Sequence, residues 1–238
     1  MPNLIQADGP AGLRLETPCT AIPIATTLAQ SWDMNLIHRM GELVGEEMKQ
    51  LHVDLWLAPG MNIHRNPLCG RNFEYYSEDP VLTGLCAATE TKGVQSQKGK
   101  GTTIKHFAGN NQEDNRMFTN AHISERALRE IYLKGFEIAV KTAQPYAIMT
   151  SYNLINGVQA SENKDLLTGI LRGEWDFKGM VTTDWWTHGE HYRETKAGND
   201  IKMANGYEER VQEAFEKGYI TRDEIALCAK RILTMILR

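Results

Sequence analysis

Strand-like and helix-like segments alternate along the whole chain, and this alternation constrains the fold more than any other feature. Short apolar runs rich in β-branched residues predict strands, and the longer amphipathic stretches between them predict helices. The predicted strands are residues 4–7, 22–27, 53–58, 102–104, 147–150, 180–183 and 201–203. The predicted helices are residues 34–51, 80–98, 124–141, 164–173, 190–196, 207–217 and 221–237. Repeated units of this kind favour a parallel sheet wrapped by helices.

Polar residues stand at or just past the ends of several predicted strands. Asp8 follows the first strand, Lys105 and His106 follow the fourth, and Asp184 follows the sixth. A (β/α)8 barrel carries its catalytic residues at such strand ends, whereas the chain lacks the glycine-rich phosphate motifs of nucleotide-binding doubly wound folds. We therefore expect an α/β, TIM-barrel-like (β/α)8 domain spanning residues 1–238. About seven strands are predicted where eight are needed, and the chain opens directly on a strand, so we expect truncation at the N-terminus.

The charge balance, the cysteines and the hydropathy exclude several kinds of partner. The 26 Lys and Arg against 30 Asp and Glu give a net charge of −4 without a basic stripe, so nucleic acid is not expected. The four cysteines are scattered without a CxxC pair, which favours buried thiols over a disulfide frame and fits a reducing compartment. No apolar run approaches the ~18 residues of a membrane span, and residues 1–6 lack the regions of a signal peptide. These observations favour a cytoplasmic protein without a membrane partner.

Residues 179–186 form the strongest candidate for a functional site, because an apolar run stops abruptly on Asp184 and is followed by Trp185 and Trp186. A carboxylate flanked by large aromatic rings favours a partly desolvated pocket in which a sugar ring can stack. We expect Trp185 to form the wall of that pocket and Trp186 to pack behind it. The competing interpretation is structural: Asp184 caps the following loop or pairs with Lys105.

Six short motifs together resemble, in order and spacing, the catalytic barrel of glycoside hydrolase family 3. They are residues 8–14 (DGPAGLR), 70–74 (GRNFE), 77–80 (SEDP), 105–107 (KHF), 149–153 (MTSYN) and 183–185 (TDW). The resemblance implies a retaining β-glucosidase without a cofactor that releases terminal non-reducing β-D-glucosyl residues from β-glucosides or short β-linked oligosaccharides. It also implies that Asp184 is the nucleophile. Retaining chemistry needs such an ionised carboxylate at the anomeric carbon and a second acid about 5 Å away.

The same resemblance assigns sugar-binding roles to four further residues. Lys105 and His106 are similar to a pair that hydrogen-bonds sugar hydroxyls, and the charge of Lys105 is also expected to keep Asp184 ionised. Asp8 is expected to accept two hydroxyl protons, and Arg71 to offer a planar fork of donors. Each assignment competes with a structural interpretation: a solvated lysine beside a core histidine for the first pair, and loop stabilisation for the second.

Three neighbouring features complete the candidate site. Glu74 is a candidate partner that orients Arg71, and Tyr152 is expected near Asp184, either positioning that carboxylate or packing as a barrel aromatic. Residues 188–191 (HGEH) superficially suggest a metal motif, but this spacing does not place two imidazoles on one helical face, so no metal is expected.

The residue that would protonate the leaving group is not evident. In the two-domain branch that the resemblance implies, it is a Glu of a separate α/β sandwich domain, which we expect to be absent from this chain and to act as a partner. In the single-domain β-N-acetylhexosaminidases it is a His in the loop after Lys-His-Phe, but residues 108–116 contain no His. Glu113 and Asp114 are the nearest substitutes. Two further hypotheses stay open: a carbohydrate-binding barrel without turnover, and a barrel lyase that forms a Schiff base through Lys105.

Overall fold

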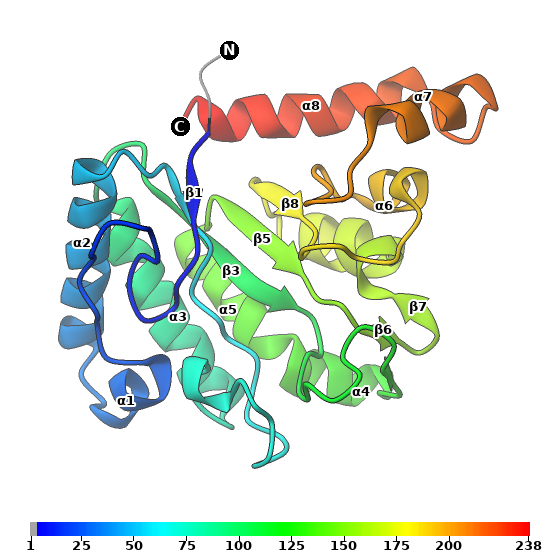
Figure 1. Cartoon of the computed structure of the whole chain (residues 1–238). Helices are drawn as coiled ribbons and strands as arrows, with labels where there is room; N and C mark the ends of the chain where they lie inside the picture. Colours follow the sequence, from blue (N-terminus) through cyan, green and yellow to red (C-terminus); the bar gives the residue numbers. More distant parts are fainter. Residues whose placement is uncertain (1–3) are drawn as a thin grey trace.

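A five-stranded parallel sheet forms the centre of the protein in the computed structural model, which describes residues 4–238 (Figure 1). Its strands follow the chain in the order β1 (Gln6–Ala7), β2 (Leu55–Trp56), β3 (Gly101–Phe107), β5 (Ala147–Thr150) and β8 (Met180–Thr182). A doubly wound sheet reverses its strand order at a switch point, whereas a barrel does not. The predicted α/β, TIM-barrel-like class is therefore confirmed. Residues 1–3, on which part of the signal-peptide argument rests, lie outside the described residues.

Three long helices cover one face of this sheet. They are α2 (Met34–Gln50), α3 (Pro80–Gln95) and α5 (Lys134–Ala143), which lie side by side in Figure 1. The backbones of α2 and α3 approach closely, because a Cβ atom at Gly93 would lie 2.2 Å from the carbonyl oxygen of His38. Ile37, Phe107 and Phe136 belong to the buried hydrophobic cluster that forms the main core.

Polar caps explain where several helices begin. The Asp33 carboxylate accepts hydrogen bonds from the backbone at the start of α2, and Asp79 does the same for α3. Thr221 and Glu224 form the predicted capping box of α8 (Arg222–Ile236). The predicted helix at 124–141 is divided into α4 (Glu125–Ala127), the π-helix η2 (Leu128–Tyr132) and α5, and the helix at 164–173 is the π-helix η4 (Asp165–Glu174).

One predicted strand is wrong, because residues 22–27 contain Pro23 and lead into helix α1 (Ala25–Gln30). Proline lacks the N–H that a sheet ladder needs, and the buried positions Ala25, Leu28 and Ala29 follow helical spacing. The predicted strand at 201–203 is reduced to a single parallel bridge between Thr182 and Ile201.

Helix α8 lies across the gap between the two edge strands of the sheet, β1 and β8. Residues after β8 form α6 (His191–Ala197) and α7 (Glu208–Glu216), and α8 then returns across the molecule so that its C-terminal end lies near β1 (Figure 1). Met235 of α8 packs with Leu55 and Met180 of the sheet. Among residues 4–238, no helix combines the length and the apolar character needed to cross a membrane.

A small second sheet stands beyond the carboxyl ends of β3 and β5. It contains β4 (Asn120–Ala121), β6 (Leu154–Ile155) and β7 (Val158–Gln159). Asn156 and Gly157 join β6 to β7 with positive φ angles of 49° and 87°, which is the backbone of a tight hairpin turn. Two 3-10 turns, η1 (Asn72–Glu74) and η3 (Ala160–Glu162), flank the same end of the molecule.

Candidate active site

A cavity of about 690 Å³ opens where the carboxyl ends of the strands meet, a size that suits a small-molecule site. Every site residue predicted from the sequence lines it: Asp8, Arg71, Lys105, His106, Tyr152, Asp184 and Trp185. Residues far apart in the chain are brought together because parallel strands place their carboxyl ends at one edge of the sheet.

Lys105 and His106 both reach the cavity although they are neighbours on β3. Successive side chains of a regular strand point to opposite faces, but the pairing of β3 with β5 shifts register between Lys105 and Phe107. Asn62 holds this irregular backbone, since its amide donates to the carbonyl oxygen of His106 and accepts from the His106 N–H, both at 2.8 Å.

Asp8 lies between two cations. The Lys105 Nζ is 2.6 Å from one carboxylate oxygen of Asp8, and the Arg14 guanidinium donates to the other. Burial would raise the pKa of Asp8, but the charge and hydrogen bond of Lys105, together with the Gly9 N–H and Arg14, outweigh it and hold that pKa below its usual value. Lys105 therefore pairs with Asp8 and not with Asp184, so the interpretation of Asp184 as its partner is wrong.

Asp184 follows β8 and is only 5% exposed. Burial raises the pKa of its carboxyl, and this rise is opposed by hydrogen bonds from the Trp185 backbone N–H and the Tyr152 hydroxyl. The Trp185 N–H donates to Oδ1 at 2.7 Å. The charges of Arg71 and Lys105 act in the same direction but less strongly, so the expected help from Lys105 is a minor influence.

His106 is the nearest imidazole to Asp184, with its Nε2 atom 3.7 Å from Oδ2. Burial, assisted by Arg71 and Lys105, holds the pKa of His106 well below its usual value, so the ring is neutral. The Tyr75 hydroxyl lies 3.1 Å from Nδ1 and accepts from the Asn110 amide.

Arg71 is held in place by Glu74, as expected from the sequence. The Nε atom of Arg71 donates to Oε1 of Glu74, and both side chains are largely buried. This bond leaves the terminal nitrogens of the guanidinium for the cavity. Arg71 thus presents a fixed fork of donors there.

Arg116 was not predicted from the sequence although it lines the cavity. Its guanidinium lies 4.7 Å from the centre of the Tyr152 ring, and Glu113 binds it at 2.8 Å. Glu113 also accepts from the Asn110 amide at 3.1 Å. Neither Glu113 nor Asp114 lines the cavity, so Glu113 supports Arg116 and does not face a ligand. The only sequence signal for Arg116 is its place in the polar loop after β3.

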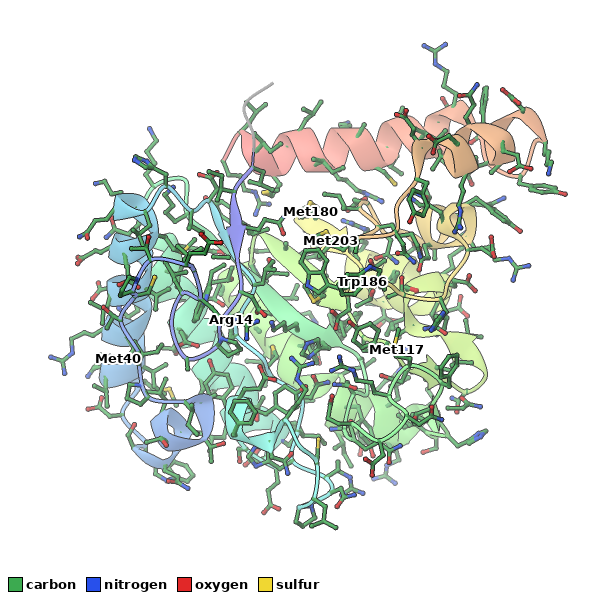
Figure 2. All side chains as sticks on the ribbon, viewed as in Figure 1. Arg14, Met40, Met117, Met180, Trp186 and Met203 are labelled. Atoms are coloured by element: carbon green, nitrogen blue, oxygen red, sulfur yellow. The ribbon has the colours of Figure 1, made fainter. Side chains whose placement is uncertain are left out.

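The two tryptophans differ in their surroundings. Trp185 lines the cavity, and the ring of Trp186 packs against it with 6.1 Å between ring centres, although Trp186 is 62% exposed and lies beside Met203 (Figure 2). The backbone of Trp186 is left-handed, with φ of 56°. His188 stacks on Phe118 with 4.8 Å between ring centres. Within residues 4–238, no group of three or more His, Cys, Asp or Glu side chains is arranged to hold a metal ion.

The arrangement can bind a polyhydroxylated ring and attack it. Asp8 and Arg71 offer a fixed acceptor and a fixed set of donors, and Trp185 offers an apolar wall. Asp184 adds a buried carboxylate whose hydrogen-bond donors are neutral. The two carboxylates Asp8 and Asp184 have pKa values shifted in opposite directions, which is the usual mark of two different chemical tasks.

Comparison with known proteins gives consistent matches over the whole chain. Residues 1–235 match the profile of the glycosyl hydrolase family 3 N-terminal domain. Beta-glucosidase A of Butyrivibrio fibrisolvens is 51% identical over 229 residues, which cover 94% of this chain and 28% of that protein. An exo-alpha-(1->6)-L-arabinopyranosidase of Bifidobacterium breve is 44% identical over 250 residues, covering 99% of this chain and 33% of that protein.

The structure of beta-glucosidase 3B from Thermotoga neapolitana in complex with glucose superimposes with a TM-score of 0.94 at 46% identity. The match covers 100% of this chain and 36% of that one. The chain thus spans about a third of the length of the relatives that it matches.

Proposed function

Because the chain belongs to glycosyl hydrolase family 3 through its N-terminal domain, we propose that it is the nucleophile-bearing, sugar-binding barrel of a retaining β-glucosidase. The observation that carries this proposal is the place of Asp184, a buried carboxylate at a strand end in a cavity lined by hydroxyl-binding groups. Two of the similar proteins are beta-glucosidases, one of them solved with glucose, and these support a terminal β-D-glucosyl residue as the substrate group.

In the proposed reaction, an ionised Asp184 oxygen attacks the anomeric carbon while the glycosidic C–O bond breaks. The leaving oxygen takes the bonding electron pair and needs a proton, and a glycosyl ester on Asp184 results. Water then attacks the same carbon, loses a proton to the group that protonated the leaving oxygen, and releases the Asp184 carboxylate. The Trp185 N–H and the Tyr152 hydroxyl hold the Asp184 carboxylate in place during these steps.

The sugar hydroxyls are proposed to bind the charged groups around Asp8. Its ionised carboxylate accepts hydroxyl protons, and Lys105, His106 and Arg71 donate to hydroxyl oxygens. Trp185 covers the apolar face of the ring. Because these donors and acceptors are already held by one another, the sugar meets a preorganised set of partners.

We propose that the general acid is a Glu of a second, α/β sandwich domain, and that residues 1–238 form the barrel domain alone. Asp8 is a poor proton donor because two cations keep it ionised, and Glu74 is bound to Arg71. A carboxylic acid that donates a proton near neutral pH needs a raised pKa instead.

Covalent labelling tests the proposal, because 2,4-dinitrophenyl 2-deoxy-2-fluoro-β-glucoside has a leaving group that needs no acid. We expect one fluoroglucosyl adduct, located on Asp184 by intact mass and peptide mapping. An unlabelled protein that is folded and binds glucose would instead support the carbohydrate-binding barrel without turnover.

A Schiff-base lyase is a weaker candidate, because its lysine must act as a neutral amine. The Nζ atom of Lys105 is held in an ion pair with Asp8 at 2.6 Å, which occupies the nitrogen that would have to attack a carbonyl carbon. Borohydride in the presence of a carbonyl substrate is therefore expected to leave Lys105 unmodified.

A further inference from the structure

The loop that carries Asp184 and Trp185, residues 183–190, has little regular structure of its own. Its backbone is tied to the segment that follows α6. The Thr183 N–H donates to the Ile201 carbonyl at 3.0 Å, and the Trp186 N–H donates to the Met203 carbonyl at 3.4 Å. In Figure 2, Trp186 and Met203 lie beside each other at this junction. The position of the candidate nucleophile therefore depends on how segment 201–203 is held.

Lys202 lies at the centre of that segment, and its side chain is 1% exposed. Its ammonium donates to the carbonyl oxygens of Thr187 and Gly189 at 3.2 and 2.9 Å, and to the Thr187 hydroxyl at 3.0 Å. Buried carbonyl groups in an irregular loop need such partners, because no neighbouring strand supplies them. Lys202 therefore binds the far half of the loop directly.

Glu194 of α6 balances the charge of Lys202, with 2.7 Å between Oε2 and Nζ. Its other oxygen accepts from the hydroxyls of Thr187 and Ser161 at 2.9 and 2.8 Å. Gly189 fits against this carboxylate, since a Cβ atom there would lie 2.4 Å from Oε1. The loop is thus enclosed by a buried ion pair whose polar atoms are all engaged with it or with each other.

An ion pair in this place needs a reason, because two apolar side chains of similar volume usually stabilise a fold at least as well. What an apolar pair cannot do is bind two carbonyl oxygens and a hydroxyl of one loop in fixed directions. We propose that Lys202 and Glu194 are positioning residues, which hold loop 183–190 so that Asp184 and Trp185 keep their places in the cavity. The catalytic consequence of this inference rests on the proposed function. The statement that the two residues hold the loop rests only on the contacts described above.

The test uses the neutral double variant K202M/E194Q, because Lys202→Met by itself would leave a buried, unpaired carboxylate and risk unfolding. We expect the maximal rate of labelling by the fluoroglucoside to fall about 10- to 100-fold, while its half-saturating concentration changes little. The hydroxyl-binding residues Asp8, Arg71, Lys105 and His106 lie outside loop 183–190, so their binding of the sugar is spared. Amide hydrogen exchange in peptides covering residues 183–190 is expected to become faster.

Arg231→Met is the matched control. Arg231 binds Asp200, the residue two before Lys202, at 3.3 Å, and Asp200 is also buried and bound by Arg172 at 2.7 Å. That cluster holds the Val181 N–H of β8 and does not touch loop 183–190. The control should lose stability but keep its labelling rate and loop exchange.

Two outcomes overturn the inference: loop exchange that stays unchanged in K202M/E194Q, or a labelling rate that stays unchanged in the folded double variant. If the parent protein is not labelled at all, the proposed function fails. Faster exchange of loop 183–190 in the double variant but not in the control then still supports Lys202 and Glu194 as the residues that hold the loop.

Discussion

Asp8 and Asp184 stand at opposite edges of the same sheet and line the same cavity, but their surroundings differ in charge. Asp8 follows β1 and is bound by Lys105 and Arg14, so its pKa lies below the usual value. Asp184 follows β8 and is bound by a backbone N–H and a tyrosine hydroxyl, but burial outweighs these hydrogen bonds and raises its pKa. A carboxylate neutralised by cations suits binding, whereas one held by neutral donors keeps more of its nucleophilic character.

Replacing Asp184 has the largest expected effect, because it removes the reacting oxygen. We expect Asp184→Ala to abolish labelling by the fluoroglucoside, a loss of about 10⁴-fold or more. Glucose binding, measured by titration calorimetry, should change little since the hydroxyl-binding groups remain. Asp165→Ala, at an exposed surface position, serves as the control and should be labelled normally. A glucosyl adduct on the Asp184→Ala protein would remove the proposed distinction between the two carboxylates.

Replacing Asp8 should weaken binding more than it slows chemistry. Asp8→Asn loses charge-assisted bonds to two hydroxyls at about 2 kcal/mol each, so the efficiency of labelling should fall about 10³-fold. We expect most of this loss in the half-saturating concentration of the fluoroglucoside. A loss confined to the maximal rate would show that Asp8 acts on the reacting centre, contrary to the comparison.

The sequence placed these two carboxylates correctly because a parallel sheet gathers its strand ends at one edge, so position in the chain implies position in space. It could not show which carboxylate Lys105 would bind, because that depends on distances across the cavity. Arg116 and Lys202 were missed for the same reason: the ring of Tyr152 and the carbonyls of Thr187 and Gly189 meet them only in the folded chain.

A third carboxylate, Glu90 of α3, shows what burial does without a cation. It is 2% exposed and bound by the Tyr76 hydroxyl, and burial raises its pKa to about 7, against a slight lowering by that bond. Between its ordinary pKa of 4.5 and about 7, the folded state holds a proton that the unfolded state has lost. The contribution of Glu90 to the free energy of unfolding is therefore fully present below pH 4.5. It falls by about 3 kcal/mol as the pH rises through 7.

Glu90→Gln removes that loss, so its stability should exceed that of the parent by more at pH 8 than at pH 4. The difference between those two pH values should reach about 3 kcal/mol in denaturant titrations. Glu46→Gln, at an exposed position of α2, should show no such trend. If the gain in stability of Glu90→Gln over the parent is the same at both pH values, Glu90 is ionised in the folded protein. Neighbouring cations then matter less for a buried carboxylate than the comparison of Asp8 with Asp184 implies.

Tyr152→Phe has the smallest expected effect and tests the neutral donors of Asp184 directly. The Tyr152 hydroxyl lowers the pKa of Asp184 by binding its charged form, so removing it should raise that pKa further. Labelling requires the ionised carboxylate. In a plot of labelling rate against pH, the rate of the variant should therefore fall at acidic pH and recover at higher pH. The profile should shift toward higher pH without losing its plateau.

A lowered plateau with an unshifted profile would contradict this, and would give Tyr152 a role on the sugar instead. The same substitution separates the two carboxylates, because Asp8 is held by Lys105 and Arg14 and not by Tyr152. Half-saturation by the fluoroglucoside, which reports on the residues around Asp8, should therefore keep its value while the labelling profile moves. Only a carboxylate whose charge depends on neutral donors responds to the loss of one hydroxyl in this way.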